Sequence, residues 1–502
     1  MNKIYFLVFS FTIFCFHSKC QISTDTNYVK SKIVYNQLYA FMDTSANYIQ
    51  YYSTDALTHF FEKLKKSNNS KVRILHIGDS HLQADIGASC TRNLLQEAFG
   101  FGGRGSIFPY TIAKTHATYD YEVKGYGIWE RTRNIDTASI FDLGITGITA
   151  RTYDTSAGFE IQFIKDRAKI QPNFTKLKLF CYTGLNSFDC QYRLNDNEEW
   201  KNINCTNVSK NKSCIEISLL HSPSSISMRV LKTNNNQQYF ELYGLSLESD
   251  EDKGILYNSV GINGAKLGSF LKENLYERQI AEFNPDLVIV DLIANDLAFG
   301  DFNQTKIESD LKNCIKKIRT SSPNTSIMFV GMQNIYVKGR NIINAGLYSS
   351  FLKQFSAFNN VAFYDYYIVS GGANSMKKWY SNGLSSKDMC HLSTTGYTIK
   401  GNLFSNAILK SYLHYLKNDS SSLIIYERKG SENKILDKKE IIKKNPTPKT
   451  KKESTIFYKV KKGDSIFTIA KKYKTTPLKI KALNKLNSNK LTIGQTLKIN
   501  NK

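Results

Sequence analysis

Two kinds of hydrophobic pattern alternate along the chain and predict most of its elements. Short apolar runs typical of buried strands are separated by stretches in which apolar residues recur every three or four positions, as on one face of a helix. The predicted strands are Val72–Ile77, Leu287–Ile293, Ser326–Met332 and Val361–Tyr367. The predicted helices are Asp55–Lys66, Thr91–Phe99, Lys306–Thr320, Ile343–Phe358 and Thr395–Leu416. Alternation of this kind favours a parallel sheet covered by helices on both faces.

The pattern changes between Tyr119 and Asp250, where apolar and polar residues alternate with a period of two. Examples are Phe159–Phe163, Ile215–Leu219 and Phe240–Leu247, with turn-forming Asn, Asp, Ser and Gly residues between such stretches. This pattern predicts an antiparallel β-sandwich inserted into the α/β domain. Exposed aromatic residues of such an insert would be candidates for sugar contacts, and packing in its core is the alternative.

The two ends of the chain have their own character. Met1–Cys20 contains a lysine and then an apolar run that is too short to span a bilayer, which is the layout of a secretory signal peptide. We therefore expect an exported protein that is cleaved near Cys20, and a lipid anchor on Cys20 is the alternative. Residues 21–70 are expected to form a helical extension, and residues 427–455 a Lys-rich linker that cannot bury a core.

Charge is concentrated at the C-terminal end. The chain has a formal net charge of +24. Ten basic and five acidic residues lie between Glu427 and Glu453, and twelve lysines and one aspartate lie from Ile456 to the end. A cationic tail on an exported protein suits an anionic envelope polymer or membrane surface, and export argues against nucleic acid. The alternative is compositional, because runs of charge are usually just solvated.

Seven cysteines lie outside the predicted signal peptide, and four of them fall in the β-rich region. Cys181 and Cys190, and Cys205 and Cys214, are each separated by turn-forming residues. In an oxidising compartment they are candidates for two local disulfides, and the alternative is that they are buried thiols.

The candidate chemistry comes from two short strings far apart in the sequence. Gly78-Asp79-Ser80 closes the first predicted strand and presents a serine hydroxyl, and Asp388 precedes His391 by three residues. A serine becomes a good nucleophile when an imidazole takes its proton, and a carboxylate can hold that imidazole in the required tautomer. The two strings therefore predict a dispersed Ser-His-Asp hydrolase triad.

Several neighbouring residues have simpler interpretations. A second Gly-Asp-Ser string ends at Ser465, where the serine is expected to cap a helix. His81 adjoins Ser80 and is expected to point elsewhere, and Cys390 is interpreted as a packing residue. No metal-ligand spacing and no cofactor motif is found in the sequence, so neither a metal nor a cofactor is expected.

Together these strings resemble the conserved blocks of the SGNH (GDSL-like) hydrolases. Gly78-Asp79-Ser80 matches the nucleophile block, and Asp388-x-x-His391 with Gly396-Tyr397 matches the acid–base block. Asn258–Gly264 fits the glycine block. Ile293-Ala294-Asn295-Asp296 lies where the family usually has Gly-Thr-Asn-Asp, so this loop is expected to sit differently. The resemblance implies a flavodoxin-like three-layer α/β/α domain built from residues 71–118 and 251–420, with the sandwich at 119–250.

The same resemblance implies roles for individual residues. Ser80 is the nucleophile, His391 the base and Asp388 the residue that orients the imidazole. The oxyanion hole consists of the Ser80 and Gly264 N–H groups and the Asn295 amide, with Gly261 as an outside candidate. Asp79 supports the loop.

Residues 456–500 read as strand, helix, helix and strand, and resemble a LysM domain, a module that binds N-acetylglucosamine-containing glycans such as peptidoglycan. The resemblance rests on the opening Val460–Ile466, the central Leu483-Asn484 and the close Ile493–Ile499. It implies a glycan groove between two loops, formed by Gly463, Asp464, Ser465, Pro477, Leu478 and Ile480.

Within the SGNH hydrolases, Gly-Asp-Ser-His followed by Gln83-Ala84-Asp85, Gly103-Arg104-Gly105 and Phe108-Pro109 resembles the peptidoglycan O-acetylesterases, which carry an inserted sandwich. The resemblance implies hydrolysis of the acetyl ester on muramic acid O6 through an acetyl-serine. The alternatives are an esterase or acetyltransferase acting on another acylated polysaccharide or lipid, and a catalytically weak wall-binding protein.

Overall fold

The computed structural model describes residues 24–52, 55–164, 167, 174–206, 213–298, 302–417, 454–461, 463–473, 475, 477–484, 486 and 491–501. These residues belong to two compact units, Met1–Tyr426 and Glu427–Lys502, which are described separately. The predicted signal peptide and most of the predicted linker lie outside the described residues. Within the described ranges, no helix combines the length and the apolar character needed to cross a membrane.

A sheet of five parallel strands lies at the centre of the first unit. Its strands, in spatial order, are β13 (Gly254–Gly261), β1 (Lys71–Gly78), β14 (Leu287–Asp291), β15 (Ser326–Val330) and β18 (Ala362–Tyr364). Numbered along the chain, the order is 2-1-3-4-5, which is the flavodoxin-like arrangement. Nearly all residues of β14 and β15 are buried, which explains their unbroken apolar runs.

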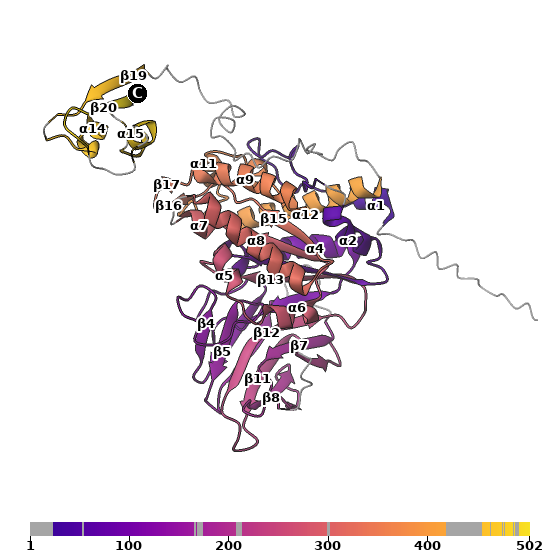
Figure 1. Ribbon diagram of the computed structural model, residues 1–502. Coiled ribbons are helices and arrows are strands. Elements are labelled where there is room, and N and C mark those ends of the chain that lie inside the picture. The colour runs from indigo at the N-terminus through magenta and orange to yellow at the C-terminus, as the bar shows by residue number, and fades with distance from the viewer. Residues whose placement is uncertain are drawn as a thin grey trace, which may run out of the picture. The chain divides into compact units, whose positions relative to one another are not determined.

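Helices cover both faces of this sheet, as predicted (Figure 1). Helix α4 (Ile86–Phe99) packs against α12 (Thr394–Leu416), and α5 (Leu267–Leu271) and α6 (Tyr276–Phe283) pack against α8 (Gln304–Ser321). The chain runs from β1 to β13 and then back across β1 to β14, so right-handed crossovers place these two groups of helices on opposite faces. The remaining helices of the unit are α1 (Thr26–Ser31), α2 (Asp55–Lys65), α3 (Ser80–Gln83), α7 (Ala294–Ala298), α9 (Asn344–Phe358), α10 (Tyr366–Val369) and α11 (Ser375–Ser381). A small hairpin joins β16 (Tyr336–Val337) and β17 (Arg340–Asn341).

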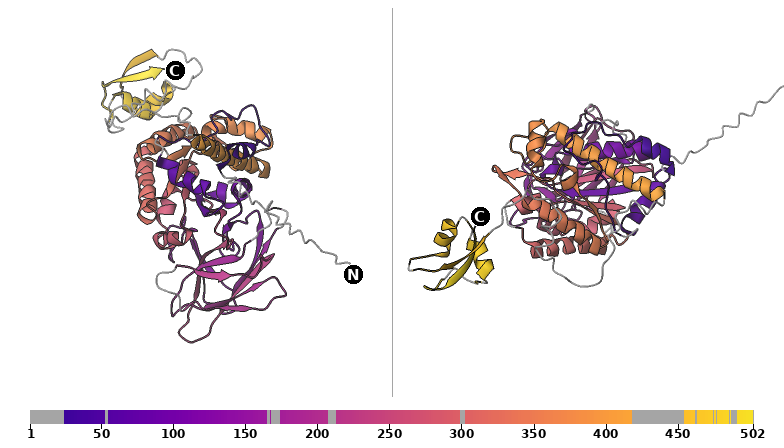
Figure 2. Two further views of the ribbon diagram at one scale, coloured as in Figure 1. Left: turned by 90° about the vertical axis from the view of Figure 1, so that its right-hand side faces the viewer. Right: turned by 90° about the horizontal axis from the view of Figure 1, so that it is seen from above.

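The N-terminal segment packs onto the α/β unit, where its indigo ribbon lies beside the orange α12 in both views (Figure 2). The Asn47 side chain donates a hydrogen bond to the Leu403 carbonyl at 2.9 Å. Gln50 exchanges two backbone hydrogen bonds with Phe363 of the edge strand β18, each 2.8 Å long. The segment therefore satisfies an edge that would otherwise be open to pairing with another chain.

Two antiparallel sheets form the β-sandwich that interrupts the α/β unit between α4 and β13. One sheet has the order β10-β7-β12-β5-β4, with β2 also paired to β12, and the other has the order β3-β6-β11-β8-β9. Their bounds are β2 (Gly103–Ile107), β3 (Tyr121–Tyr126), β4 (Glu130–Arg133), β5 (Ile148–Thr152), β6 (Gly158–Phe163), β7 (Lys176–Cys181), β8 (Asp189–Leu194), β9 (Lys201–Ile203), β10 (Ile215–Ser218), β11 (Ser225–Leu231) and β12 (Phe240–Glu248). β2 lies in the part of the chain expected to belong to the hydrolase domain, yet its pairing joins it to the sandwich.

The cysteines do not form the two local pairs considered from the sequence. All seven in the described chain are free thiols. Cys190 of β8 lies 3.8 Å, sulfur to sulfur, from Cys205, which follows β9. Since β8 pairs with β9 in a register that sets Cys190 opposite Ile203, Cys205 emerges on the same face two residues later. Strand pairing, not closeness in sequence, brings these two thiols together.

The second unit is a β-α-α-β module, as predicted. β19 (Ser454–Lys459) pairs antiparallel with β20 (Thr496–Asn501), and α14 (Ile466–Lys472) and α15 (Pro477–Asn484) lie between them in the chain. Its small core includes Tyr458, Val460, Ile466, Ile469, Ala470, Ile480, Leu497 and Ile499.

Candidate active site

Ser80 begins α3 immediately after β1, at the carboxyl end of the central sheet. The preceding Asp79 caps this short helix by accepting the His81 N–H at 2.9 Å. β1 and β14 are the neighbouring strands at which the chain reverses its direction across the sheet. Open α/β sheets bind ligands at the carboxyl ends of the strands beside such a reversal, so Ser80 occupies the position that the fold favours for a site.

His391 and Asp388 reach Ser80 from the loop that precedes α12. Nε2 of His391 lies 2.9 Å from Ser80 Oγ, and its Nδ1 lies 2.7 Å from Asp388 Oδ2. Partial burial raises the pKa of the Asp388 carboxyl, but hydrogen bonds from Ser386, from His391 and from the Cys390 and His391 N–H groups outweigh burial and hold this pKa below its usual value. A carboxylate that stays ionised keeps the proton on Nδ1 and leaves Nε2 free to accept one from Ser80.

A tight turn after β13 contains a backbone N–H group without an acceptor in the described chain, and the first residue of this turn, Ile262, donates its N–H to the Gly78 carbonyl at 3.1 Å. This turn, Ile262–Ala265, is called the Gly264 turn, and the Ala265 N–H closes it by donating to the Ile262 carbonyl at 2.9 Å. Gly264 has φ = 87°, a value that a turn with glycine in its third position requires. Within the described chain, neither the Gly264 N–H nor the Ser80 N–H donates a hydrogen bond. Gly261, in contrast, lies within β13 opposite Gly78.

The side-chain amide of Asn295, in the first turn of α7, donates hydrogen bonds to two neighbouring groups. Its amide nitrogen lies 3.3 Å from Asp79 Oδ2 and 3.1 Å from the Ala265 carbonyl oxygen, so both amide hydrogens have acceptors. Ile293, at the position where glycine was expected, has φ = 129°, which is an outlier for a β-branched residue. The backbone therefore keeps a glycine-like conformation despite the substitution, and Asn295 stays within reach of Asp79.

The Asp79 carboxyl is buried, and burial, reinforced by the nearby Asp291, raises its pKa to about 7. A carboxyl whose pKa rises on folding binds more protons in the native state, so its contribution to stability is full below about pH 4 and is lost as the pH rises through about 7. We expect the free energy of unfolding to fall over this window by up to ~4 kcal/mol more in the wild type than in Asp79→Asn. Urea unfolding at a series of pH values measures this difference, and parallel curves for the two proteins would contradict it.

His81 and Cys390 lie near the triad without joining it. The His81 ring lies 5.3 Å from the His391 ring, centroid to centroid, with the two planes tilted by 34°, and its Nδ1 lies 3.1 Å from the Tyr397 hydroxyl. Burial lowers the pKa of His81 to about 3, so it is neutral and cannot supply a charge. Burial and the neighbouring Asp388 raise the pKa of Cys390 to about 12, which keeps it a thiol and a poor nucleophile.

The residues expected to form the glycan groove differ in exposure and in the hydrogen bonds that they make within the second unit. Gly463 is exposed with φ = 89°, and Asp464 accepts hydrogen bonds from the Tyr458 hydroxyl and the Lys461 N–H, both at 2.8 Å. Ser465 Oγ accepts the Thr468 N–H at 3.1 Å, which confirms that this serine caps a helix. Ile480 is buried in the core, so its side chain does not face a groove. The side chains of Pro477 and Leu478 lie outside the described residues.

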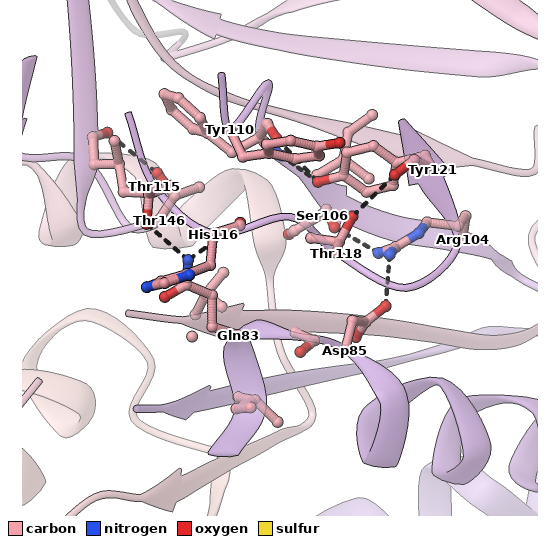
Figure 3. A pocket seen from close by; sticks show the side chains of 17 residues that line it. Gln83, Asp85, Arg104, Ser106, Tyr110, Thr115, His116, Thr118, Tyr121 and Thr146 are labelled. Carbon is pink, nitrogen blue, oxygen red and sulfur yellow. Dashed lines mark hydrogen bonds and ion pairs between the residues drawn. The ribbon is translucent and has the colours of Figure 1, made fainter. Parts of the chain in front are cut away.

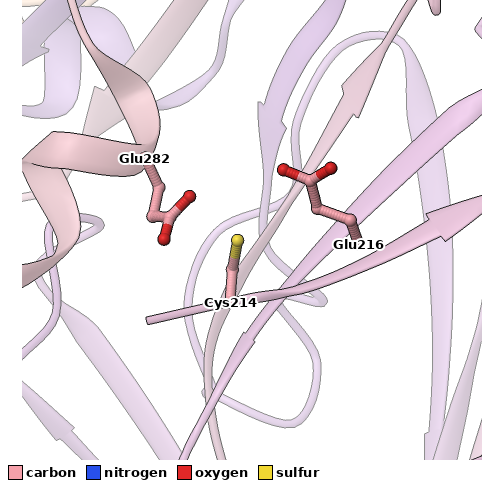
Figure 4. Close-up of side chains that lie close together, drawn as sticks. All are labelled: Cys214, Glu216 and Glu282. Atoms are coloured by element: carbon pink, nitrogen blue, oxygen red, sulfur yellow. The ribbon is translucent and has the colours of Figure 1, made fainter. Parts of the chain in front are cut away.

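One side-chain cluster in the described chain has the composition of a metal site. The ligand atoms of Cys214, Glu216 and Glu282 lie within 4.8 Å of one another (Figure 4). Burial, together with Glu282, raises the pKa of Cys214 to about 12, and Lys178 lies 3.7 Å from a Glu216 oxygen. The protonated thiol carries no charge, and Lys178 already neutralises the Glu216 carboxylate, so we assign no metal to this cluster.

A cavity of about 60 Å³ lies between α3 and the start of the sandwich (Figure 3). Gln83 borders it on one side and Asp85 and Arg104 on the other. Arg104 donates to Asp85 at 2.5 Å and to Asp120 at 2.7 Å, and all three side chains are buried. The sequence pattern pointed to the strings containing Gln83, Asp85 and Arg104 without assigning them a role. The place of Gln83, a polar residue one helical turn after the nucleophile, is the feature of the sequence that could have drawn attention to it.

Comparison with known proteins identifies two domains. The GDSL-like lipase/acylhydrolase family matches residues 237–399, and the LysM domain matches residues 458–500. The first match includes Gly264, Asn295, Asp388 and His391 but not Ser80, because the sandwich separates the serine from the other blocks. No curated protein matches the chain closely enough to count as a relative.

One solved structure extends the likeness in fold to most of the chain. A structure of a peptidoglycan O-acetylesterase is 20% identical, covers 74% of this chain and 99% of its own, and has a TM-score of 0.58. An acetylxylan esterase from Geobacillus stearothermophilus is 22% identical over 32% of this chain and 73% of its own, with a TM-score of 0.25. A putative acylhydrolase from Bacteroides fragilis is 19% identical over 32% and 76%, with a TM-score of 0.24.

The family match and the fold define the class of the larger domain. It is a GDSL-like lipase/acylhydrolase domain, which is a carboxylic ester hydrolase domain, and it carries an inserted β-sandwich. More particularly, the protein is a two-part chain in which this hydrolase domain is followed by a LysM domain.

Proposed function

We propose that this protein is an exported serine esterase that removes O-acetyl groups from peptidoglycan, at O6 of muramic acid, through an acetyl-serine intermediate. The observation that carries the proposal is the hydrogen-bonded chain from Ser80 through His391 to Asp388. The N–H groups of Ser80 and Gly264, which donate no hydrogen bond within the described chain, are the expected oxyanion donors. The fold shared with a peptidoglycan O-acetylesterase and the LysM domain on the same chain support the choice of polymer.

In the first half-reaction, His391 Nε2 takes the proton of Ser80 Oγ as this oxygen attacks the acetyl carbonyl carbon. The carbonyl oxygen becomes an oxyanion and receives the N–H groups of Ser80 and Gly264, each worth about 3 kcal/mol in a site of this kind. His391 then gives its proton to the sugar oxygen, the carbon–oxygen bond breaks, and the alcohol leaves. Asp388 holds the imidazole throughout.

In the second half-reaction, water attacks the acetyl-serine while His391 removes its proton, and acetate leaves as Ser80 recovers its hydrogen. The Asn295 amide joins the oxyanion by giving up its long contact with Asp79, which at 3.3 Å is the weaker of its two hydrogen bonds. The buried Asp79 braces the loop that carries Ser80.

The exposure of the triad suits a polymeric substrate. The side chains of His391 and Asp388 are 41% and 49% exposed, so a glycan strand reaches the serine without first entering a deep pocket. The proposed layout is a signal peptide at 1–20 and a helical extension at 21–70. The hydrolase domain consists of residues 71–118 and 251–420, and the sandwich at 119–250 is inserted between these two parts. A linker at 427–455 leads to the LysM domain at 456–500. The LysM domain binds the N-acetylglucosamine-containing polymer and raises the local concentration of acetyl esters.

Acetate release tests this function. The wild type is expected to release acetate from O-acetylated peptidoglycan and none from the same polymer after chemical de-O-acetylation. A variant ending at Tyr426 is expected to hydrolyse a soluble chromogenic acetate at the wild-type rate but to act more slowly on sacculi and to sediment with them less. Activity confined to acetylated xylan or to lipid esters would contradict the proposed substrate, and acetylated sugar acceptors in place of free acetate would indicate transfer.

A further inference from the structure

The orientation of the Gly264 N–H depends on how the Gly264 turn is held. In a four-residue turn the middle peptide has two orientations that differ by about 180°, and glycine at the third position permits either. A flip of this peptide would point the N–H away from Ser80. The Ala265 carbonyl, after the middle peptide, is held by Asn295 at 3.1 Å. The peptide between Ile262 and Asn263, which precedes the middle peptide, must also be held by a hydrogen-bond partner.

Gln83 supplies that second anchor. Its side-chain Oε1 accepts the Asn263 N–H at 2.5 Å, and Asn263 directly precedes Gly264. Gln83 is the last residue of α3, whose first residue is Ser80, so one helical turn connects the nucleophile to this anchor. A Cβ atom on Gly261 would lie 2.4 Å from the Gln83 backbone nitrogen, so the two segments are also in close backbone contact.

The other end of the Gln83 amide is held by the segment between β2 and β3, which leads into the second sheet of the sandwich. Its Nε2 donates to Thr115 Oγ1 at 2.7 Å and to the His116 carbonyl at 3.4 Å. Gln83 is one of the residues that line the cavity (Figure 3). Hydrogen bonds at both ends of its side-chain amide hold it in position.

We propose that Gln83 is a positioning residue: its side-chain amide bridges Thr115 to Asn263 and thereby holds the Gly264 N–H toward the oxyanion. The inference rests on the proposed function, because it assigns a role within the same reaction. The segment leading into the inserted sandwich thereby supports catalysis although no residue of that segment touches the reacting atoms.

Gln83→Met tests the proposal, because methionine has a similar length and lacks both the acceptor and the donor. Complete loss of one oxyanion donor costs ~100- to 1000-fold in rate, and loosening one should cost a part of that. We expect kcat for a chromogenic acetate ester to fall about 10-fold with KM unchanged within about twofold. Steady-state kinetics and thermal unfolding of the full chain provide the readouts.

Gln279→Met is the matched control. Gln279 is also buried, and its Oε1 accepts the Ile145 N–H at 2.8 Å, so it also uses a side-chain carbonyl to hold a backbone N–H. This variant is expected to lower Tm without lowering kcat. A kcat in Gln83→Met equal to that of the control, or a change confined to KM, would overturn the proposal.

Thr115→Val is the second test, and it applies even if Gln83→Met does not fold. It removes one end of the bridge and leaves Gln83 in place, so kcat should fall by a smaller factor, about two- to fivefold, again with KM unchanged. An unaltered kcat in this variant overturns the proposal. An inactive wild type would refute the proposed function itself, whereas an active wild type with unaffected variants would refute only the role of Gln83.

Discussion

Ser80→Ala is expected to lower kcat for acetate ester hydrolysis by about 10³- to 10⁶-fold while the protein folds normally. The reason is that Ser80 Oγ is the atom placed 2.9 Å from His391 Nε2, and alanine leaves the base without a nucleophile to activate. Any residual rate would come from the N–H groups of residue 80 and Gly264, which the substitution does not remove. Steady-state kinetics on a chromogenic acetate and on O-acetylated peptidoglycan measures the effect.

The control for this variant is Ser381→Ala, which removes an exposed serine at the end of α11. It is expected to match the wild type in kcat and Tm. Because Ser80 is only partly buried, Ser80→Ala should unfold within a few degrees of the wild type. Activity of Ser80→Ala within tenfold of the wild type would show that another group performs the attack.

Asp388→Asn is expected to lower kcat by about 10²- to 10⁴-fold with a much smaller effect on KM. An asparagine amide facing Nδ1 favours the imidazole tautomer with hydrogen on Nε2, which cannot accept the Ser80 proton. The carboxylate also stabilises the imidazolium that forms. Since the Asp388 side chain is 49% exposed, water can replace part of this interaction, and we expect the lower half of the range.

Asp196→Asn is the matched control, because Asp196 is an exposed aspartate on the sandwich whose side chain is 75% accessible. It should leave kcat unchanged. Activity of Asp388→Asn within threefold of the wild type would show that His391 keeps its tautomer without this carboxylate, and would remove Asp388 from the triad.

The larger elements were predictable because their hydrophobic patterns are long and regular. The predicted helices Lys306–Thr320 and Thr395–Leu416 correspond to α8 and α12 with ends that differ by one or two residues. The predicted strand Leu287–Ile293 ends earlier, at Asp291, because Ile293 leaves the sheet with a positive φ. β13 was not predicted, since its apolar residues are followed by a glycine-rich stretch that reads as a loop.

The residues of the triad could be predicted from the sequence, but the hydrogen bonds that surround the triad could not. Ser80, Asp388 and His391 stand out because their types and order fit one chemistry. The contacts of Asn295 with Asp79 and of Gln83 with Asn263 join residues 216 and 180 positions apart in the sequence. Local patterns carry no signal for such contacts.

Ile293 shows how the core can tolerate a backbone conformation that is unfavourable for its own residue type. A positive φ at a β-branched residue costs about 1–3 kcal/mol. Its side chain is 1% exposed, and burial of an isoleucine contributes about 2 kcal/mol, so packing offsets the strain. The sequence showed only that glycine was missing, whereas the compensation lies in the tertiary core.

In the proposed mechanism Ser80 carries the acetyl group during turnover. Rapid acid quenching of the enzyme with a chromogenic acetate, followed by mass spectrometry of the intact protein and of its peptides, detects such an intermediate. One added acetyl group on Ser80 is expected in the wild type, and no such adduct in Ser80→Ala. Turnover without any acetyl-enzyme, or an acetyl group on another residue that remains in Ser80→Ala together with activity, would contradict this mechanism.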